Sequence, residues 1–283
     1  MGGEIRQGIP AAGAVELLHN FSMVHDDIQN GAPEREGRPA VWWLWGPAQG
    51  INVGDGLHAL ARLSLLGLED CGVPALRILK AVRILDTACL ELFEGQYEEL
   101  IFQERTQVLP GAYFSAAAKR AGALWSCAAG LGALAAEGDE ETIALCQRGG
   151  MKFGVACQIQ EEILEIWDNR GNIVPSGALL NKRKSLPVIY ALNSGEPQTR
   201  RELATLYLQR VLEPKILPRV IELLDQARGK ECCEQLVNTM VQESVQNLAQ
   251  AGIEEESLVQ IRRLAKLLLA SYEDPQLGKE FGG

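Results

Sequence analysis

Two short acidic clusters contain the residues whose types and spacing best suit chemistry. In the first cluster, Asp26, Asp27 and Asn30 lie in one predicted helix, and residues 26 and 30, four apart, share a face of it. Closely spaced carboxylate and amide oxygens are the ligands that hard divalent cations prefer. An Asp-Asp pair near a helix end is usually an ordinary solvated surface, so this cluster alone is weak evidence for a metal site.

The second cluster, Glu161, Glu162 and Glu165 in QIQEEILEIWD, repeats this spacing. Like charges on adjoining helix positions oppose one another, and a bound metal ion would relieve that repulsion. The alternative is a solvated acidic face. Apolar residues around the cluster favour carboxylates that project into a cavity; these are Phe153, Val155, Ile159, Ile163 and Ile166.

Basic residues occur at three places where an anion can bind. Arg35 and Arg38 follow the first cluster, and guanidinium groups suit phosphate oxygens. Residues 182–184 (Lys-Arg-Lys) precede a predicted helix, where free backbone amides also favour an anion. Lys119 and Arg120 interrupt an apolar stretch, a position that usually belongs to a snorkelling surface side chain.

Composition limits the possible classes of protein. The formal net charge of the 283 residues is -10, which argues against nucleic acid and anionic membranes as general partners. The seven cysteines include no CxxC pair, so neither a disulfide framework nor a zinc site is indicated. The first ten residues have no apolar signal region, and the run 121–136 is too short to span a bilayer. We expect a soluble, cytoplasmic protein without a transmembrane segment.

Helical periodicity predicts an all-α fold, and the absence of period-2 alternation makes strands unexpected. The residues form one predicted domain, 1–283, because no repeat, low-complexity segment or convincing boundary interrupts them. The predicted helices cover about 11–30, 51–68, 75–104, 110–136, 139–169, 186–194, 198–212, 216–228, 230–251 and 254–273.

The string HDDIQ, ERxGRP, WWLWG and INVGD between residues 25 and 55 resembles the first Asp-rich region of trans-isoprenyl diphosphate synthases, the polyprenyl synthetase family. The resemblance continues to about residue 195. It implies an isoprenoid synthase-type helical bundle around a deep central cavity, usually a homodimer. It also implies magnesium ions, three with bound diphosphate, and an allylic prenyl diphosphate as substrate.

Carried over by position, the resemblance assigns roles to individual residues. The implied metal ligands are Asp26, Asp27, Asn30, Glu161, Glu162 and Glu165. The implied catalytic residues are Asp26, Asp27, Glu161, Glu162 and Gln158. The implied substrate contacts are Arg35, Lys119, Arg183, Lys184, Gln96 and Phe21. Phe21 occupies a position that limits chain length in the family, which suits a prenyl chain of about fifteen to twenty carbons.

This sequence departs from the family pattern in four respects. Asn30 is neutral where the family has a third aspartate, and Glu36 replaces the second arginine of a pair. The second cluster is all glutamate, whose extra methylene moves each carboxylate by roughly 1.5 Å. The Gly-Lys-x-x-Arg-Pro type segment that holds isopentenyl diphosphate is not found upstream of Asp26.

These departures lead to four hypotheses. The first is a terpene synthase-like enzyme that ionises the allylic diphosphate with magnesium and then cyclises the cation or quenches it with water. The second is a prenyltransferase that makes a prenyl diphosphate such as geranylgeranyl diphosphate. The third is a non-catalytic subunit that regulates an active synthase in a heteromer. The last is a helical scaffold without a ligand. We favour the first, because both clusters keep oxygen ligands and the basic residues remain.

Overall fold

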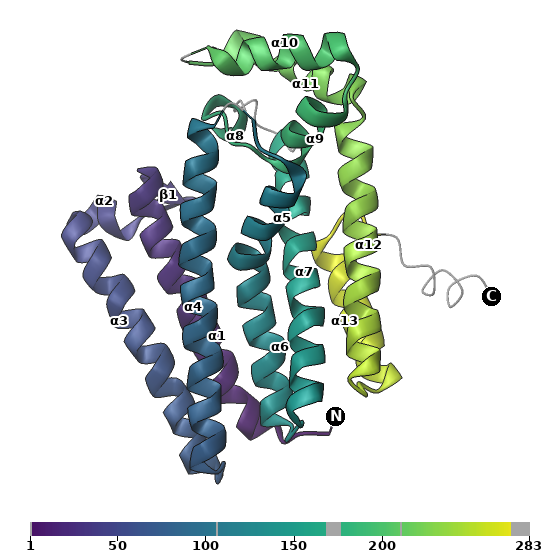
Figure 1. Ribbon diagram of the computed structural model, residues 1–283. Helices are drawn as coiled ribbons and strands as arrows, with labels where there is room; N and C mark the ends of the chain where they lie inside the picture. Colours follow the sequence, from purple (N-terminus) through teal and green to yellow (C-terminus); the bar gives the residue numbers. More distant parts are fainter. Residues whose placement is uncertain (1, 106, 168–176, 210, 273–283) are drawn as a thin grey trace. The chain divides into compact units, whose positions relative to one another are not determined.

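The computed structural model describes residues 2–105, 107–167, 177–209 and 211–272, and nearly all of its elements are helices (Figure 1). The predicted all-α fold is therefore confirmed. These residues form two compact units: unit 1 is Met1–Leu90 with Leu124–Gln147, and unit 2 is Glu91–Ala123 with Arg148–Gly283. The single domain over 1–283 stays a prediction. No helix within the described ranges is long and apolar enough to cross a membrane.

Unit 1 is built around its N-terminal helices. Its elements are α1 (Ile5–Asn30), β1 (Glu34–Arg35), β2 (Arg38–Pro39), α2 (Val41–Trp45), α3 (Pro47–Leu66), η1 (Gly67–Cys71), the start of α4 (Ala75–Glu104), nearly all of α6 (Ala123–Ala135) and the start of α7 (Glu140–Trp167). Ala14, Leu18 and Phe21 form the buried stripe of α1, at the spacing of one helix face. Gly31, in the left-handed conformation with a φ of 61°, ends the helix.

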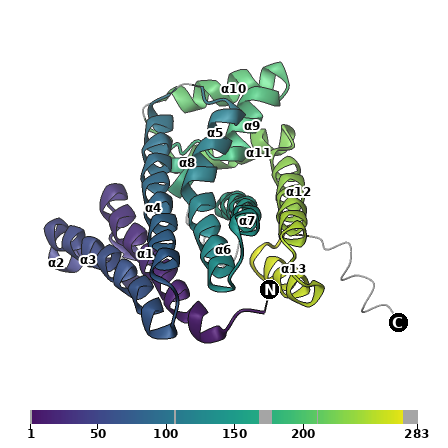
Figure 2. The same cartoon turned by 60° about the horizontal axis from the view of Figure 1, so that its bottom comes forward.

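Helices α1 and α3 lie side by side in both ribbon views (Figures 1 and 2). A Cβ atom at Gly54 would lie 2.1 Å from Nε2 of His25, and one at Gly50 would lie 2.7 Å from Cδ1 of Ile28. A side chain at either position would force His25 or Ile28 to move, so the two glycines permit this close approach. The contact sets the C-terminal half of α1, which carries the first acidic cluster, firmly against α3.

Helix α1 begins at Ile5, earlier than the expected start near residue 11, and it contains Pro10. A proline inside a helix removes one backbone hydrogen bond, here the bond to the carbonyl of Arg6. The Sγ atom of Cys71 donates to that carbonyl oxygen at 3.4 Å. Ser64 Oγ donates to the carbonyl oxygen of Pro10 at 2.8 Å. Contacts from elsewhere in the chain thus stabilise a turn that local sequence does not predict.

Strands were unexpected, and the segment after α1 contains the two short ones that the described residues form. Strands β1 and β2 form an antiparallel hairpin in which Glu34 pairs with Pro39 and Arg35 pairs with Arg38. Glu36 and Gly37 make the turn with positive φ angles of 51° and 74°. Strands of two residues are too short to show alternation in a sequence.

Unit 2 contains the rest of α4 and α7, together with shorter helices. The additional elements are α5 (Pro110–Ala117), the π-helix η2 (Ala118–Gly122), α8 (Gly177–Leu180), α9 (Leu186–Ser194), α10 (Pro197–Leu208), η3 (Pro214–Ile216), α11 (Leu217–Gln226), α12 (Gly229–Gln250) and α13 (Glu255–Leu268). Helices α12 and α13 lie together in both ribbon views. Of the predicted loop at about 170–184, residues 170–176 lie outside the described residues, and Gly177–Leu180 forms the short helix α8.

The expected helix over 110–136 is interrupted by η2, which separates α5 from α6. A Cβ atom at Gly95 would lie 2.7 Å from the backbone nitrogen of Arg120 and 2.9 Å from the carbonyl oxygen of Ala116. The missing side chain at Gly95 therefore allows α4 to pack directly on the backbone of this segment. A π-turn of this kind changes the register of the side chains that follow it and often occurs at functional sites.

Candidate active site

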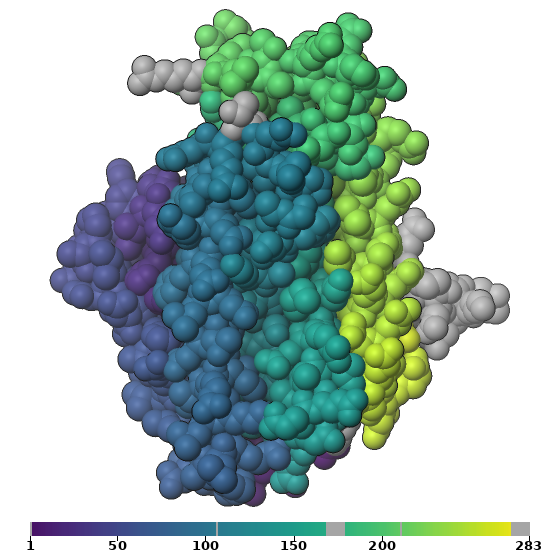
Figure 3. Space-filling view, in the orientation of Figure 1, coloured from purple at the N-terminus to yellow at the C-terminus, as the bar shows by residue number. Residues whose placement is uncertain are grey.

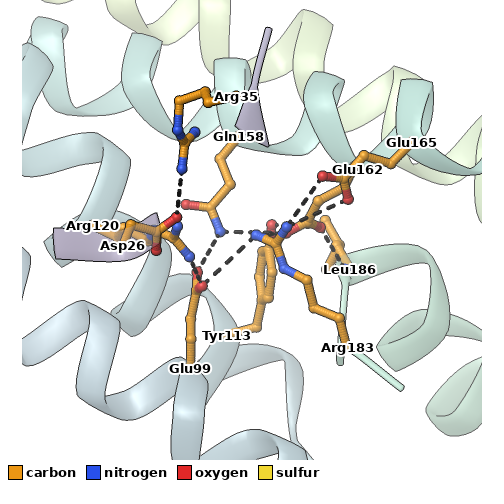
Figure 4. A network of polar contacts seen from close by, with 10 residues as sticks. All are labelled: Asp26, Arg35, Glu99, Tyr113, Arg120, Gln158, Glu162, Glu165, Arg183 and Leu186. Atoms are coloured by element: carbon orange, nitrogen blue, oxygen red, sulfur yellow. Dashed lines mark hydrogen bonds and ion pairs between the residues drawn. The ribbon is translucent and has the colours of Figure 1, made fainter. Parts of the chain in front are cut away.

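The first acidic cluster lies on the last turns of α1, and the hairpin places Arg35 against it. Arg35 Nε donates to Oδ1 of Asp27 at 2.8 Å, and Arg35 Nη2 donates to Oδ2 of Asp26 at 3.2 Å. Figure 4 shows the Arg35–Asp26 contact. Burial alone would lower the pKa of Arg35, but the hydrogen bond to Asp27 and the charges of both aspartates raise it. The first cluster therefore forms ion pairs with the predicted anion-binding arginine, and all three residues belong to unit 1.

The other residues expected near this cluster are more exposed. Asn30 is the last residue of α1 and is exposed, as are Glu36 at the hairpin turn and Arg38 beyond it. Asp27 is buried, whereas Asp26 is partly exposed. The side chains of Asp26, Asp27 and Asn30 supply oxygen donors of the kind that magnesium takes, and the two carboxylates lie within reach of one guanidinium. The donor set of the first cluster therefore fits a magnesium ion in type.

The second acidic cluster is arranged differently, because Glu162 is buried in a network of hydrogen bonds. Its Oε2 accepts from the hydroxyl of Tyr113 at 3.0 Å and from the backbone amide of Leu186 at 2.7 Å. Its Oε1 accepts from Nε2 of Gln158 at 3.3 Å (Figure 4). Burial raises the pKa of Glu162 to about 7, although the charge of Arg183 and the Leu186 amide act in the opposite direction.

Glu161 and Glu165 are more exposed than Glu162. Arg183 Nη1 lies 3.4 Å from both carboxylate oxygens of Glu165. Burial and the charge of Glu165 raise the pKa of Glu161. Both oxygens of Glu162 accept protein hydrogen bonds, and a metal ion shared by the three glutamates stays a prediction. Among the residues that the structure describes, no group of three or more His, Cys, Asp or Glu is placed to hold one.

Three residues for which the sequence predicted no role in the site belong to this network, namely Glu99, Arg120 and Tyr113. Glu99 Oε1 accepts from Nε2 of Gln158 at 2.8 Å, and Glu99 Oε2 pairs with Arg120 and lies 3.7 Å from Nη2 of Arg183. Tyr113 is fully buried, and burial together with the charge of Glu162 raises its pKa well above the ordinary value. The position of Glu99, one turn after Gly95 on a helix with a packing glycine, is the only sequence signal that points to it.

Two of the predicted substrate contacts in unit 2 have other partners. Lys119 Nζ lies 2.7 Å from Glu98 and 3.1 Å from Glu94. Lys184 is buried, and its Nζ lies 4.5 Å from the ring centroid of Tyr207. Burial lowers the pKa of Lys184 to about 8. Neither lysine joins the network around Glu162, whereas Arg183 does.

Phe21 and Gln96 are both buried. The ring of Phe21 contacts His25 edge-on at 4.8 Å and stacks on His58 at 5.4 Å between centroids. The Oε1 atom of Gln96 is buried without a hydrogen-bond partner among the described residues. The two acidic clusters belong to different units, so their convergence across one cavity stays a prediction.

Comparison with known proteins assigns the chain to a family. The family model for polyprenyl synthetase matches residues 2–224. Over 253 residues the chain is 36% identical to a geranylgeranyl diphosphate synthase of Mycobacterium tuberculosis, which covers 88% of this chain and 71% of that protein. Over 274 residues it is 30% identical to a (2E,6E)-farnesyl diphosphate synthase of Mycobacterium bovis, with 95% of this chain and 75% of the relative covered.

A solved structure agrees with these matches. The crystal structure of a polyprenyl synthetase from Streptomyces coelicolor A3(2) superposes with a TM-score of 0.84 and 29% identity, covering 95% of this chain and 80% of that one. The expected helical fold and the resemblance read from the motifs are thus confirmed together.

Proposed function

Since the chain belongs to the polyprenyl synthetase family, we propose that it is a prenyltransferase that joins isopentenyl diphosphate to an allylic prenyl diphosphate. The observation that carries the proposal is the 36% identity to a geranylgeranyl diphosphate synthase over 88% of the chain. The relatives favour this alternative over the terpene synthase-like reaction that the sequence hypothesis placed first. They give no support for a cyclase or lyase activity.

In the proposed reaction, the allylic carbon–oxygen bond breaks and diphosphate leaves with the electron pair. The double bond of isopentenyl diphosphate forms the new carbon–carbon bond, and loss of a proton completes the product. Arg35 forms an ion pair with Asp26, and Arg183 forms one with Glu165. Both carboxylates are partly accessible, and the two guanidiniums are suited to bind diphosphate oxygens. Magnesium, which this family generally uses, would be held by Asp26, Asp27 and Asn30 and would neutralise charge on the leaving group.

Incubation with isopentenyl diphosphate, magnesium and allylic diphosphates of increasing length tests the proposal. We expect a longer prenyl diphosphate, identified by mass spectrometry, and no product without magnesium. Release of diphosphate with only a hydrocarbon or alcohol product would instead favour the terpene synthase-like hypothesis. Substitution of Phe21 by Ala should lengthen the product, because it removes a buried ring at the position that limits chain length in the family.

A second candidate function is supported by the burial of Glu162. A cluster whose central carboxylate is engaged by Tyr113 and Leu186 suits a subunit that binds substrate without catalysing turnover. The same assay separates the two functions. Magnesium-dependent binding of a prenyl diphosphate without turnover, together with co-purification of an active synthase, would establish the regulatory subunit.

We further propose that the protein forms a homodimer through unit 1. Large apolar side chains of α3 and the start of α4 are exposed, namely Ile51, Val53, Leu60, Leu63, Leu66, Leu76, Leu79 and Leu90. The outer face of α4 is open in the space-filling view (Figure 3). An exposed apolar surface of this extent is typical of an interaction site. The variant Leu63→Glu should shift the mass measured by light scattering from that of a dimer to that of a monomer. A monomeric mass for the chain without substitutions would exclude this dimer.

A further inference from the structure

The guanidinium of Arg35 lies on the carboxylate oxygens of the first acidic cluster. Its Nε and Nη2 atoms lie 2.8 and 2.6 Å from Oδ1 of Asp27, and Nη2 also lies 3.2 Å from Oδ2 of Asp26. One positive group thus bridges the two carboxylates that the proposed magnesium site requires. A magnesium ion on the same oxygens would lie beside a like charge, which is unfavourable. The arginine and the metal therefore compete for this cluster.

The burial of Asp27 shows why this cluster needs a cation at all times. The side chain of Asp27 is 7% exposed, whereas that of Asp26 is 18% exposed. A buried carboxylate without a partner is strongly destabilising. In the metal-free chain, the two short contacts from Arg35 to Asp27 meet this need.

The hairpin of β1 and β2 sets the position of Arg35. Glu36 and Gly37 form its turn with positive φ angles of 51° and 74°, a combination that fits the right-handed twist of a two-stranded hairpin. At the other end, the backbone amide of Ala40 donates to the carbonyl oxygen of Pro33 at 2.9 Å. Arg35 therefore belongs to a short segment that is closed at both ends.

Trp42 fastens this hairpin to the helices on either side of it. Its Nε1 atom donates to the carbonyl oxygen of Ala32 at 2.7 Å, just beyond the end of α1. A Cβ atom at Gly50 of α3 would lie 3.1 Å from Cβ of Trp42 and 2.7 Å from Cδ1 of Ile28 on α1. The tryptophan thus packs between the end of α1 and the start of α3, and it holds the chain where the hairpin begins.

We propose that Arg35 is a resident counter-ion of the first acidic cluster, which magnesium displaces when it binds, and that Trp42 is the positioning residue that holds Arg35 there. The binding of magnesium at this cluster rests on the proposed function. Displacement transfers the two carboxylates from the guanidinium to the metal and releases the guanidinium for another anion. The contacts of Arg35 therefore weaken magnesium binding, and their removal strengthens it.

Titration calorimetry with magnesium chloride alone tests this exchange without requiring turnover. The matched variants are Arg35→Met and Arg38→Met, each of which removes one positive charge from the hairpin. Arg38 is exposed and lies opposite Arg35 in the register, but it forms no ion pair with a described residue. We expect Arg35→Met to bind magnesium about tenfold more tightly or better, because charge-assisted hydrogen bonds no longer oppose the metal. Arg38→Met should change the affinity less than about threefold at roughly 0.15 M salt, which screens exposed charges.

Because Arg35→Met leaves Asp27 without its partner, a variant that keeps the charge guards against loss of folding. Arg35→Lys retains a cation, but a compact ammonium does not bridge two carboxylates as a planar guanidinium does. It should bind magnesium about threefold more tightly with an unchanged circular dichroism spectrum. Arg35→Met should unfold at a lower temperature without magnesium and recover with it, because the metal replaces the missing partner.

Trp42→Phe tests the positioning role, since it removes the indole N–H and keeps an aromatic ring. It should lower the unfolding temperature and at the same time tighten magnesium binding about threefold, because the hairpin then holds Arg35 less firmly. A merely structural tryptophan would lower stability and leave the magnesium affinity unchanged. Combined with Arg35→Met, Trp42→Phe should add nothing to the affinity, since the residue that it positions is gone.

Three results would overturn the inference: equal tightening by Arg35→Met and Arg38→Met, an unchanged or weaker magnesium affinity in Arg35→Met, or no magnesium binding by either the unaltered chain or Arg35→Met. Failure of the proposed function gives a different pattern. A chain that shows the exchange but makes no longer prenyl diphosphate refutes the prenyltransferase alone. An active prenyltransferase whose magnesium affinity does not respond to Arg35→Met refutes the exchange alone.

Discussion

The two acidic clusters have the same spacing in sequence but different surroundings in the structure. Asp26 and Asp27 share one guanidinium from a neighbouring hairpin, and both carboxylates stay near the end of their helix. Glu162 instead turns into the interior of unit 2, where a phenol, an amide side chain and a backbone amide donate to it. The longer glutamate side chain permits this reach.

The difference shows that an i, i+1, i+4 pattern of acids does not by itself distinguish a metal site from an internal hydrogen-bond network. In the first cluster Asp26 is partly exposed and Asn30 is exposed, and the oxygens of the cluster suit a cation. In the second, the most buried carboxylate joins α5, α7 and the start of α9 to one another. We therefore expect mutations in the second cluster to affect folding most, and mutations in the first to affect ligand binding most.

The largest effect should come from Glu162→Ala. The substitution leaves the Tyr113 hydroxyl and the Leu186 amide buried without an acceptor, and it removes one of the carboxylates around Arg183. Breaking a buried, hydrogen-bonded charged group of this kind costs about 3–5 kcal/mol. Urea unfolding followed by circular dichroism measures the change in the free energy of unfolding.

Glu161→Ala is the matched control for that experiment. Burial and the charge of Glu165 raise the pKa of Glu161, so removal of its carboxylate relieves an unfavourable interaction. Its free energy of unfolding should stay within about 0.5 kcal/mol of the unaltered chain, or increase. Equal destabilisation by both variants would mean that Glu162 has no special place in the network.

Lys184 in unit 2 is buried without a carboxylate partner among the described residues, unlike Arg35 in unit 1, so it should make the stability of the protein depend on pH. Burial lowers its folded-state pKa from 10.5 to about 8. Between these values the unfolded chain binds a proton that the folded chain does not, so stability rises as pH increases from about 8 to 10.5. The rise attributable to Lys184 should be on the order of 3 kcal/mol.

Lys184→Met should remove this rise, whereas Lys152→Met should keep it, because Lys152 pairs with Glu243 at a more exposed position. Denaturant unfolding of each variant across this pH range makes the comparison. A rise that persists in Lys184→Met would show that the lysine is solvated and free to reach a ligand, as the resemblance to the family implied.

Sequence patterns predicted the helices and the family, because apolar periodicity and the motif around Asp26 are local features. They did not predict the early start of α1, since the contacts of Cys71 and Ser64 with its first turns come from distant positions. The network around Glu162 was missed for the same reason: Glu99 and Tyr113 reach it only through helix packing. The sequence shows which residue types form the second cluster, but their hydrogen-bond partners depend on the fold.

In the first cluster, Asp27→Asn should be the more destabilising aspartate variant. Asp27 is buried and accepts from Nε of Arg35 at 2.8 Å, whereas Asp26 is more exposed and accepts from Nη2 of Arg35 at 3.2 Å. Loss of a hydrogen bond between charged groups costs about 1.5–3 kcal/mol, so we expect a loss in that range for Asp27→Asn and a smaller one for Asp26→Asn. Thermal unfolding of both variants measures the difference. The reverse order would place the structural role on Asp26.

The smallest expected effect, and the most specific to the first cluster, is that of Asn30→Asp. Residue 30 ends α1, where the negative end of the helix dipole disfavours a carboxylate by about 0.3–1 kcal/mol, and Asp26 one turn earlier adds repulsion. Without magnesium the variant should therefore unfold at a slightly lower temperature than the unaltered chain. With magnesium it should regain that stability and bind the ion several-fold more tightly, because affinity for such ions follows the charge of the ligands.

Gln250→Glu is the control, since it adds the same charge at the last residue of α12, away from any aspartate pair. Magnesium should not rescue this control. If magnesium restores both variants equally, or neither, the oxygens at the end of α1 do not form a cation site.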